Sequence, residues 1–247
     1  MKRKFKVLLT RRLHKFALEK LRERYEITVH NGKIPMPKKT ILEKIKNKDG
    51  LICFPYDMID KEVIDSANKL KSISTYSVGF DHIDVNYAKK KKISIGYTPE
   101  VLTNATAELT IGLMMDLLRR ITEGDHIIRK GEWTEIFGPF DYVGTEISDK
   151  TLGILGMGRI GKTVAKKASC LGMNILYHNR KAITKSGKAK YVSLDELFKK
   201  SDIITIHIPY SKSTHHMINL KLLNKMKKTS FLINTSRGKV VNQKDLL

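Results

Sequence analysis

The segment 151–180, TLGILGMGRIGKTVAKKASCLGMNILYHNR, constrains the fold of this chain more than any other stretch. Two short apolar runs, at 152–155 and 175–177, are typical of strands, and the run between them has apolar residues at helical spacing. Gly172 follows that run, and glycine commonly ends a helix. The pattern predicts a strand, a turn, a helix and a second strand, which is the repeating unit of a parallel sheet.

A G-x-G-x-x-G sequence forms the turn between the first strand and the helix. We expect Gly156 to permit the tight turn, Gly158 to let the backbone approach a pyrophosphate, and Gly161 to allow close helix packing. Glycines also cluster in ordinary turns, so the flanking strands and helix are what make the motif indicate a dinucleotide site. The cofactor contacts predicted in this turn are Gly156, Met157, Gly158, Arg159, Ile160 and Gly161.

The residues that follow the second strand bear on the choice between NAD and NADP. NAD sites usually carry an acidic residue there, which binds the adenine ribose and repels a 2′-phosphate. This chain has Asn179, Arg180 and Lys181 instead. Two cations beside a neutral amide suit a phosphate, so we expect NADP to be preferred, with NAD as the alternative. The competing interpretation is that Arg180 and Lys181 are simply two more cations of a basic chain.

The charge of the chain raises the question of a nucleic-acid partner. Lysine and arginine number 47 against 25 acidic residues, which gives a formal net charge of +22. The excess is mostly scattered lysine, and the one dense run, 89–92, falls between a helical pattern and a strand. We therefore expect a compositional bias that attracts an anionic cofactor and substrate, and no nucleic-acid partner.

Location follows from hydropathy and cysteine usage. The N-terminal apolar run 5–9 is too short for a signal peptide or a membrane span. Cys53 and Cys170 lie far apart in apolar contexts, which predicts buried free thiols in a reducing compartment. We expect a cytoplasmic protein with no membrane partner and no metal site.

The whole chain alternates between strand-like and helix-like segments, which predicts an α/β protein with two doubly wound parallel-sheet domains, at 1–98 and 99–247. In the first domain we expect strands at 5–9, 27–29, 51–54, 73–76 and 93–97, and helices at 13–21, 41–46 and 61–70.

Three features of the second half carry further expectations. A long helix at 104–120, capped by Asn104, has apolar residues around most of its circumference and should be well buried. Ser193 and Glu196 form a capping-box pattern. Arg237 follows a strand at 231–233, where a guanidinium could orient the carboxylate of a keto or hydroxy acid. Taken alone, Arg237 is better interpreted as a surface arginine in a turn.

Several motifs occur in an order that resembles a known family. They are VGFDHID at 78–84, Thr98-Pro99 through Ala107-Glu108, RKGEW at 129–133, the glycine turn at 156–161, the segment 201–209, and INTSRG at 233–238. The chain resembles the NAD(P)-dependent D-2-hydroxyacid dehydrogenases, and within them the glyoxylate/hydroxypyruvate reductase branch. This resemblance implies a flavodoxin-like substrate domain, a Rossmann dinucleotide-binding domain, and a homodimer formed around the helix at 104–120.

The resemblance also implies residue roles. The backbone of Val78 and Gly79 would bind the substrate carboxylate, and Arg237 would be the catalytic, substrate-binding arginine. Asn179, Arg180 and Lys181 would contact the adenosine end. The remaining cofactor-pocket positions would be Thr106, His207, Pro209, Thr235 and Ser236, with His207 not acting as the general acid.

The family completes its site with a glutamate and a histidine beyond the arginine, and this sequence stops at Leu247. We therefore expect a fragment of a longer enzyme, with the Rossmann domain incomplete at its C-terminus. The intact enzyme would reduce glyoxylate or hydroxypyruvate with NADPH. The alternatives are a non-catalytic dinucleotide-binding relative, either co-repressor-like or an inactive truncated form, and a phosphoglycerate or formate dehydrogenase of the same superfamily.

Overall fold

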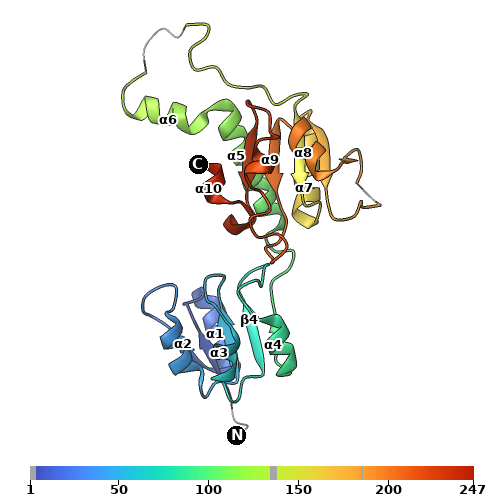
Figure 1. The fold of residues 1–247 in the computed structure, drawn as a ribbon. Coiled ribbons are helices and arrows are strands. Elements are labelled where there is room, and N and C mark those ends of the chain that lie inside the picture. The colour runs from blue at the N-terminus through green and yellow to red at the C-terminus, as the bar shows by residue number, and fades with distance from the viewer. Residues whose placement is uncertain (1–3, 134–137, 185) are drawn as a thin grey trace. The chain divides into compact units, whose positions relative to one another are not determined.

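The computed structural model describes residues 4–133, 138–184 and 186–247. The chain divides into two compact units, Met1–Val101 and Leu102–Leu247. Each unit is built on a five-stranded sheet in which all paired strands run parallel (Figure 1). The predicted fold class, two doubly wound parallel-sheet domains, is confirmed.

The first sheet has the strand order β2-β1-β3-β4-β5, which is the flavodoxin-like order. Each strand lies within two residues of the position that the sequence predicts, whereas the helix expected at 61–70 is shorter and ends at Asp65. The strands are β1 (Phe5–Leu9), β2 (Tyr25–Val29), β3 (Gly50–Cys53), β4 (Ser72–Thr75) and β5 (Ser94–Gly96). The helices are α1 (Lys15–Arg24), α2 (Lys38–Ile45), α3 (Lys61–Asp65) and α4 (Val85–Lys90).

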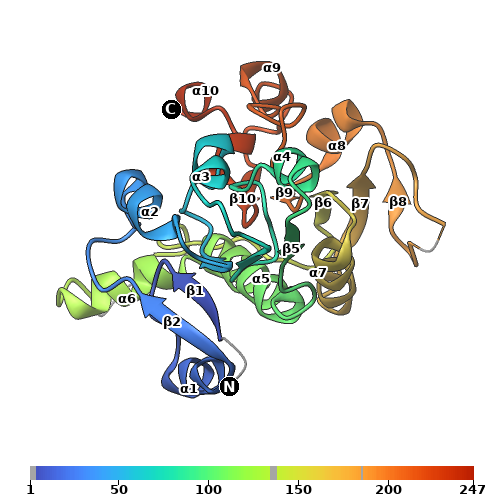
Figure 2. The same ribbon diagram turned by 90° about the horizontal axis from the view of Figure 1, so that it is seen from below.

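The core of the first unit lies on both faces of its sheet. Successive side chains of a strand point to opposite faces, so Leu8 packs with α2, α3 and α4 while Val7 and Leu9 pack with Leu18 of α1. Helices α1 and α2 accordingly lie on opposite sides of β1 and β2 (Figure 2). This double coverage explains why the strands read as nearly continuous apolar runs.

The second sheet has the order β10-β9-β6-β7-β8, which is the Rossmann order 3-2-1-4-5 when β6 to β10 are numbered in chain order and the sheet is read from the β8 edge. Its strands are β6 (Thr151–Leu155), β7 (Asn174–His178), β8 (Lys190–Tyr191), β9 (Ile203–Ile206) and β10 (Phe231–Asn234). The helices are α5 (Thr103–Arg119), α6 (Ile121–Arg129), α7 (Arg159–Cys170), α8 (Leu194–Lys200), α9 (Leu220–Leu223), the short 3₁₀ helix η1 (Gly238–Val240) and α10 (Gln243–Leu246). The capping box at Ser193 and Glu196 is confirmed.

Helix α5 corrects two expectations. It begins one residue earlier than predicted, after Leu102, and no side chain caps it, so the predicted Asn104 cap is wrong. Its buried residues are Ala107, Thr110, Met114 and Leu118, one stripe at helical spacing, while Leu109, Leu113 and Leu117 are exposed. Apolar composition around the helix therefore did not reveal which face packs, and the prediction of general burial is wrong.

The cysteines are a further partial correction. Cys53 is buried and Cys170 is exposed, and both are free thiols. Cys170 is the last residue of α7 and is not among the buried residues of this helix, which are Gly161, Val164, Ala165 and Ala168. The apolar sequence context predicted burial of both cysteines, and that prediction is confirmed for Cys53 and wrong for Cys170.

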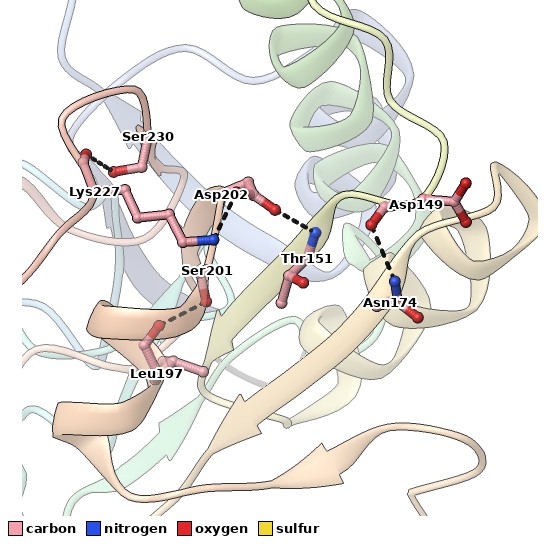
Figure 3. A network of polar contacts seen from close by, with 8 residues as sticks. All are labelled: Asp149, Thr151, Asn174, Leu197, Ser201, Asp202, Lys227 and Ser230. Atoms are coloured by element: carbon pink, nitrogen blue, oxygen red, sulfur yellow. Dashed lines mark hydrogen bonds and ion pairs between the residues drawn. The ribbon is translucent and has the colours of Figure 1, made fainter.

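The amino ends of the second sheet are tied together by Asp202, which directly precedes β9 (Figure 3). Its carboxylate accepts hydrogen bonds from the Thr151 amide and the Lys227 ammonium, each at 2.8 Å. Burial alone would raise the pKa of Asp202, but Lys227 and the Thr151 amide outweigh burial, so this pKa lies below its usual value. One ionised side chain thus fixes the starts of β6 and β9 and the turn that leads into β10.

Candidate active site

The glycine turn passes close to the segment that follows β9. Gly156 has φ +102°, and a Cβ there would lie 2.8 Å from the carbonyl carbon of His207. A Cβ on Gly161 would lie 2.1 Å from the carbonyl oxygen of Gly156. Both positions therefore require glycine, the first for its backbone conformation and the second for the close approach of α7 to the turn.

Gly158 differs from those two glycines because it faces open space. A Cβ at this position would meet no heavy atom within 4 Å, and no side chain caps the α7 N-terminus that it precedes. The first-turn amides of a helix have no intrahelical acceptor and carry a partial positive charge, which favours an anion. The turn therefore fits the pyrophosphate of a dinucleotide, with Met157 to Gly161 as the residues that would hold it.

Asn179 contacts the glycine turn directly. Its side-chain oxygen accepts a hydrogen bond from the Met157 amide at 2.7 Å, so the residue that follows β7 also fixes the turn after β6. The Tyr191 hydroxyl donates to the Asn179 carbonyl at 3.3 Å. Arg180 and Lys181 are exposed beside it. Sequence analysis assigned Asn179 to the adenosine end and did not predict its contact with Met157.

His207 connects three elements of the second unit. Its Nε2 lies 3.0 Å from the Thr205 hydroxyl, and its Nδ1 lies 3.4 Å from the Thr235 hydroxyl. Thr235 in turn lies 3.0 Å from the Thr110 hydroxyl of α5. Burial lowers the pKa of His207 to about 4. The ring is therefore neutral at pH 7, which makes it a hydrogen-bonding anchor and a poor proton donor.

The chain of hydroxyls extends from Thr235 to a further predicted residue. The Thr110 hydroxyl donates to the Thr106 carbonyl at 2.8 Å, which joins the first turns of α5 to the end of β10. Thr106, His207 and Thr235 are thus connected through intervening hydroxyl groups. The motifs include these three residues and not Thr110, because only the packing of α5 shows that Thr110 lies on the buried stripe.

The loop after β10 fixes Arg237 through its own side chains. The Asn234 amide donates to the Arg237 carbonyl at 3.0 Å, and the Asn234 oxygen accepts from the Ser236 amide at 2.9 Å. The half-buried Arg237 guanidinium donates to the Ser236 carbonyl at 3.1 Å. Asn234 is therefore a positioning residue that the motifs did not single out.

Pro209, another predicted cofactor-pocket residue, lies in the exposed segment after β9. Its carbonyl accepts a hydrogen bond from the Thr214 hydroxyl at 2.9 Å.

In the first unit, Val78 and Gly79 lie in a half-buried loop after β4. The carbonyl of Ser77 accepts from the Thr98 amide at 3.0 Å, and the carbonyl of Gly79 accepts from the Ser77 hydroxyl at 2.5 Å. Among the described residues, neither the Val78 nor the Gly79 amide donates to a protein acceptor. Adjacent unengaged amides are suited to an anion.

The predicted site residues fall into two groups, each inside one unit. The cofactor-pocket residues and Arg237 belong to the second unit, and the Val78-Gly79 backbone belongs to the first. Within the described ranges 4–133, 138–184 and 186–247, no group of three or more potential ligands could hold a metal ion. In the same ranges, no helix combines the length and the apolar character needed to cross a membrane.

Comparison with known protein families identifies the family to which this architecture belongs. Residues 111–247 match the NAD binding domain of the D-isomer specific 2-hydroxyacid dehydrogenases. The chain belongs to this family. The resemblance in the sequence motifs is thereby confirmed, and so are an NAD-dependent dehydrogenase activity and a nicotinamide dinucleotide cofactor.

Relatives of this dehydrogenase agree over nearly its whole length. A glyoxylate reductase of Thermofilum pendens is 44% identical over 247 residues, which cover 98% of this chain and 73% of the relative. A crystal structure of a Thermus thermophilus protein matches with a TM-score of 0.91 at 41% identity, covering 98% of this chain and 76% of that one. D-lactate dehydrogenase of Aquifex aeolicus, complexed with NAD and lactic acid, matches with a TM-score of 0.86 at 31% identity, covering 98% and 72%. This dehydrogenase thus spans about three quarters of the relatives' lengths.

Proposed function

We propose that this dehydrogenase reduces glyoxylate or hydroxypyruvate to the corresponding 2-hydroxy acid, with NADPH as the preferred hydride donor. The observation that carries the proposal is Arg237, which is held by Asn234 and Ser236 next to the Thr235–His207 chain. A guanidinium binds a carboxylate through two parallel hydrogen bonds and so orients it. Relatives named glyoxylate reductase support the choice of substrate.

The proposal divides the work between residues 1–98 as substrate domain and 99–247 as NAD(P)-binding domain. When bound, the cofactor supplies the hydride. The amides of Val78 and Gly79 bind the substrate carboxylate, and Arg237 orients the substrate and polarises its carbonyl, which combines orientation with electrostatic stabilisation. His207, neutral at pH 7, holds Thr235 in place beside the nicotinamide.

The cofactor preference rests on the residues after β7. The Asn179 oxygen is engaged by the Met157 amide, and no carboxylate stands at this position to repel a 2′-phosphate. The exposed Arg180 and Lys181 supply two cations for that phosphate. These features support NADP over NAD.

We also propose a cytoplasmic homodimer. The exposed Leu109, Leu113 and Leu117 recur every four residues along α5, and so form an apolar stripe beside the buried one. Such a stripe is suited to a second copy of the chain.

Steady-state kinetics of the full-length protein with glyoxylate, hydroxypyruvate and both cofactors test the proposal. Arg237→Ala should lower kcat/KM by at least about 100-fold, or about 3 kcal/mol, while leaving the Kd for NADPH near its original value. The matched control is Arg22→Ala, an exposed arginine of α1, which should behave as the unaltered protein. A full-length protein that binds NADPH without reducing either acid would favour the co-repressor-like or inactive alternative. A fully active Arg237→Ala variant would remove Arg237 from the site.

A further inference from the structure

A chain of buried side-chain hydrogen bonds lies at the base of the Val78-Gly79 loop. The Thr75 hydroxyl lies 2.8 Å from the Ser77 hydroxyl and 2.9 Å from His82 Nε2, and the Ser77 hydroxyl lies 2.5 Å from the Gly79 carbonyl oxygen. Thr75, Ser77 and His82 are only 2%, 7% and 4% exposed. The chain therefore joins the last residue of β4 to residues on both sides of Val78.

The direction of each hydrogen bond in this chain follows from its chemistry. The Gly79 carbonyl can only accept, so Ser77 donates to it. The single Ser77 proton is then used, so Thr75 donates to Ser77, and His82 Nε2 must carry the proton that Thr75 accepts. The Cys53 sulfur lies 3.8 Å from the same nitrogen, and burial raises the pKa of the Cys53 thiol to about 12, which keeps it neutral.

These bonds restrain the part of the loop that is otherwise free to rotate. Gly79 has no side chain, so its backbone has more conformational freedom than its neighbours. A peptide N–H points away from the carbonyl of the same planar unit, so the bond from the Thr98 amide to the Ser77 carbonyl directs the Val78 N–H away from Thr98. The Ser77 hydroxyl fixes the peptide on the other side of Gly79. Both flanking peptides of the Val78–Gly79 unit are therefore held by hydrogen bonds.

We propose that Thr75, Ser77 and His82 are positioning residues that preorganise the Val78 and Gly79 amides for the substrate carboxylate. This inference rests on the proposed function of those amides. A donor held in place before the substrate arrives loses no conformational freedom on binding, so a fixed loop binds a carboxylate more tightly than a mobile one. Because hydrogen bonds in a buried chain strengthen one another, the loss of any member should weaken the remaining bonds.

Substitution of the hydroxyls tests this proposal. Ser77→Ala and Thr75→Val should each raise the KM for glyoxylate and the inhibition constant of oxamate, an unreactive analogue, by about 10-fold. The value of kcat should change little, because a lost carboxylate contact weakens substrate and transition state alike. The Kd for NADPH should not change. Thr75→Ser keeps the hydroxyl and should restore most of the affinity that Thr75→Val loses.

The matched control is Ser66→Ala, which removes another unit-one serine hydroxyl that donates to a backbone carbonyl, that of Val63, at 2.8 Å. It should leave both constants unchanged. In a Ser77→Ala background, Thr75→Val should have no further effect, because Thr75 acts through Ser77. Additive losses, or an unchanged oxamate constant in folded Thr75→Val, would overturn the inference. Should Ser77→Ala not fold, Thr75→Val, which preserves the side-chain shape, decides. Absence of 2-oxo acid reduction by the full-length protein without substitutions would instead refute the proposed function.

Discussion

Each unit contains a five-stranded parallel sheet, but the two sheets differ at the switch point, which is the place where the strand order reverses. In the second unit, β6 and β9 meet there, and glycines leave the turn after β6 open to an anion. In the first unit, β1 and β3 meet there, and the buried side chains of Thr10 and Asp57 fill the space. Asp57 accepts hydrogen bonds from the Thr10 hydroxyl and, at 2.8 Å, from the Phe54 amide.

The difference shows that the carboxyl edge of a parallel sheet is not by itself a nucleotide site. Ligands favour switch points, but the residues that follow the first strand decide whether backbone amides are accessible there. In the described part of the first unit, two adjacent unengaged amides occur after β4, at Val78 and Gly79. Both units nevertheless support their loops in the same way, through a buried threonine that contacts a histidine: Thr75 with His82, and Thr205 with His207.

The largest expected effects come from the glycine turn. Gly161→Ala places a Cβ 2.1 Å from the Gly156 oxygen, so it should destabilise the second unit by about 3 kcal/mol and abolish NADPH binding.

Gly158→Ala adds a methyl group that meets no neighbour, so this variant should fold normally. It should bind NADPH at least about 10-fold more weakly, because the methyl group occupies the space of the pyrophosphate. Urea unfolding and fluorescence titration measure both properties. Normal NADPH binding by Gly158→Ala would show that the pyrophosphate does not approach this residue.

The side chains that fill the switch point of the first unit should affect the stability of the protein and not its binding of NADPH. Asp57→Ala removes the acceptor of the Phe54 amide and leaves the buried Thr10 hydroxyl with only the Ile52 carbonyl, at 3.4 Å, so it should lower the free energy of unfolding by about 2 kcal/mol. Asp57→Asn keeps an acceptor oxygen and should cost less. The Kd for NADPH, measured on the folded proteins, should stay constant. A loss of NADPH affinity as large as that of Gly158→Ala would break the contrast between the two units.

The smallest expected effect concerns cofactor choice. Asn179→Asp combined with Arg180→Ala keeps an acceptor for the Met157 amide, adds a charge that repels a 2′-phosphate and removes one cation. The ratio of kcat/KM for NADPH to that for NADH should fall about 10-fold. Asn179→Ala, which removes the acceptor, should weaken both cofactors equally. A ratio that the double substitution leaves unchanged would contradict the phosphate interpretation of Arg180.

Periodicity and turn residues predicted most of the fold because both act locally. The apolar runs at 152–155 and 175–177 became β6 and β7, and the capping box at Ser193 formed as expected. The Asn104 cap failed because a cap depends on where the chain enters the helix, and α5 begins one residue before Asn104. The prediction that α5 is buried all round failed because its leucines are distributed around the helix. Only packing against α7 determines which stripe is buried.

The candidate site was predicted as a set of residues, and its internal bonding was not. Asn179 and Met157 are 22 residues apart, and their hydrogen bond depends on β6 and β7 ending side by side in the sheet. The contact of His82 with Thr75 likewise depends on the path of a loop that has no periodic pattern. Motifs locate the residues that face a ligand, whereas tertiary structure alone reveals the residues that hold them.

The position of Asp202 has a consequence for how this protein can be altered. It joins the starts of β6 and β9 at the amino edge of the second sheet, while the turns that follow β6, β7 and β9 lie at the opposite edge. Stability and recognition are therefore built into opposite ends of the same strands. Those turns can therefore be substituted without changing the Asp202 hydrogen bonds at the amino edge. The second sheet could in this way carry turns that bind other anionic ligands.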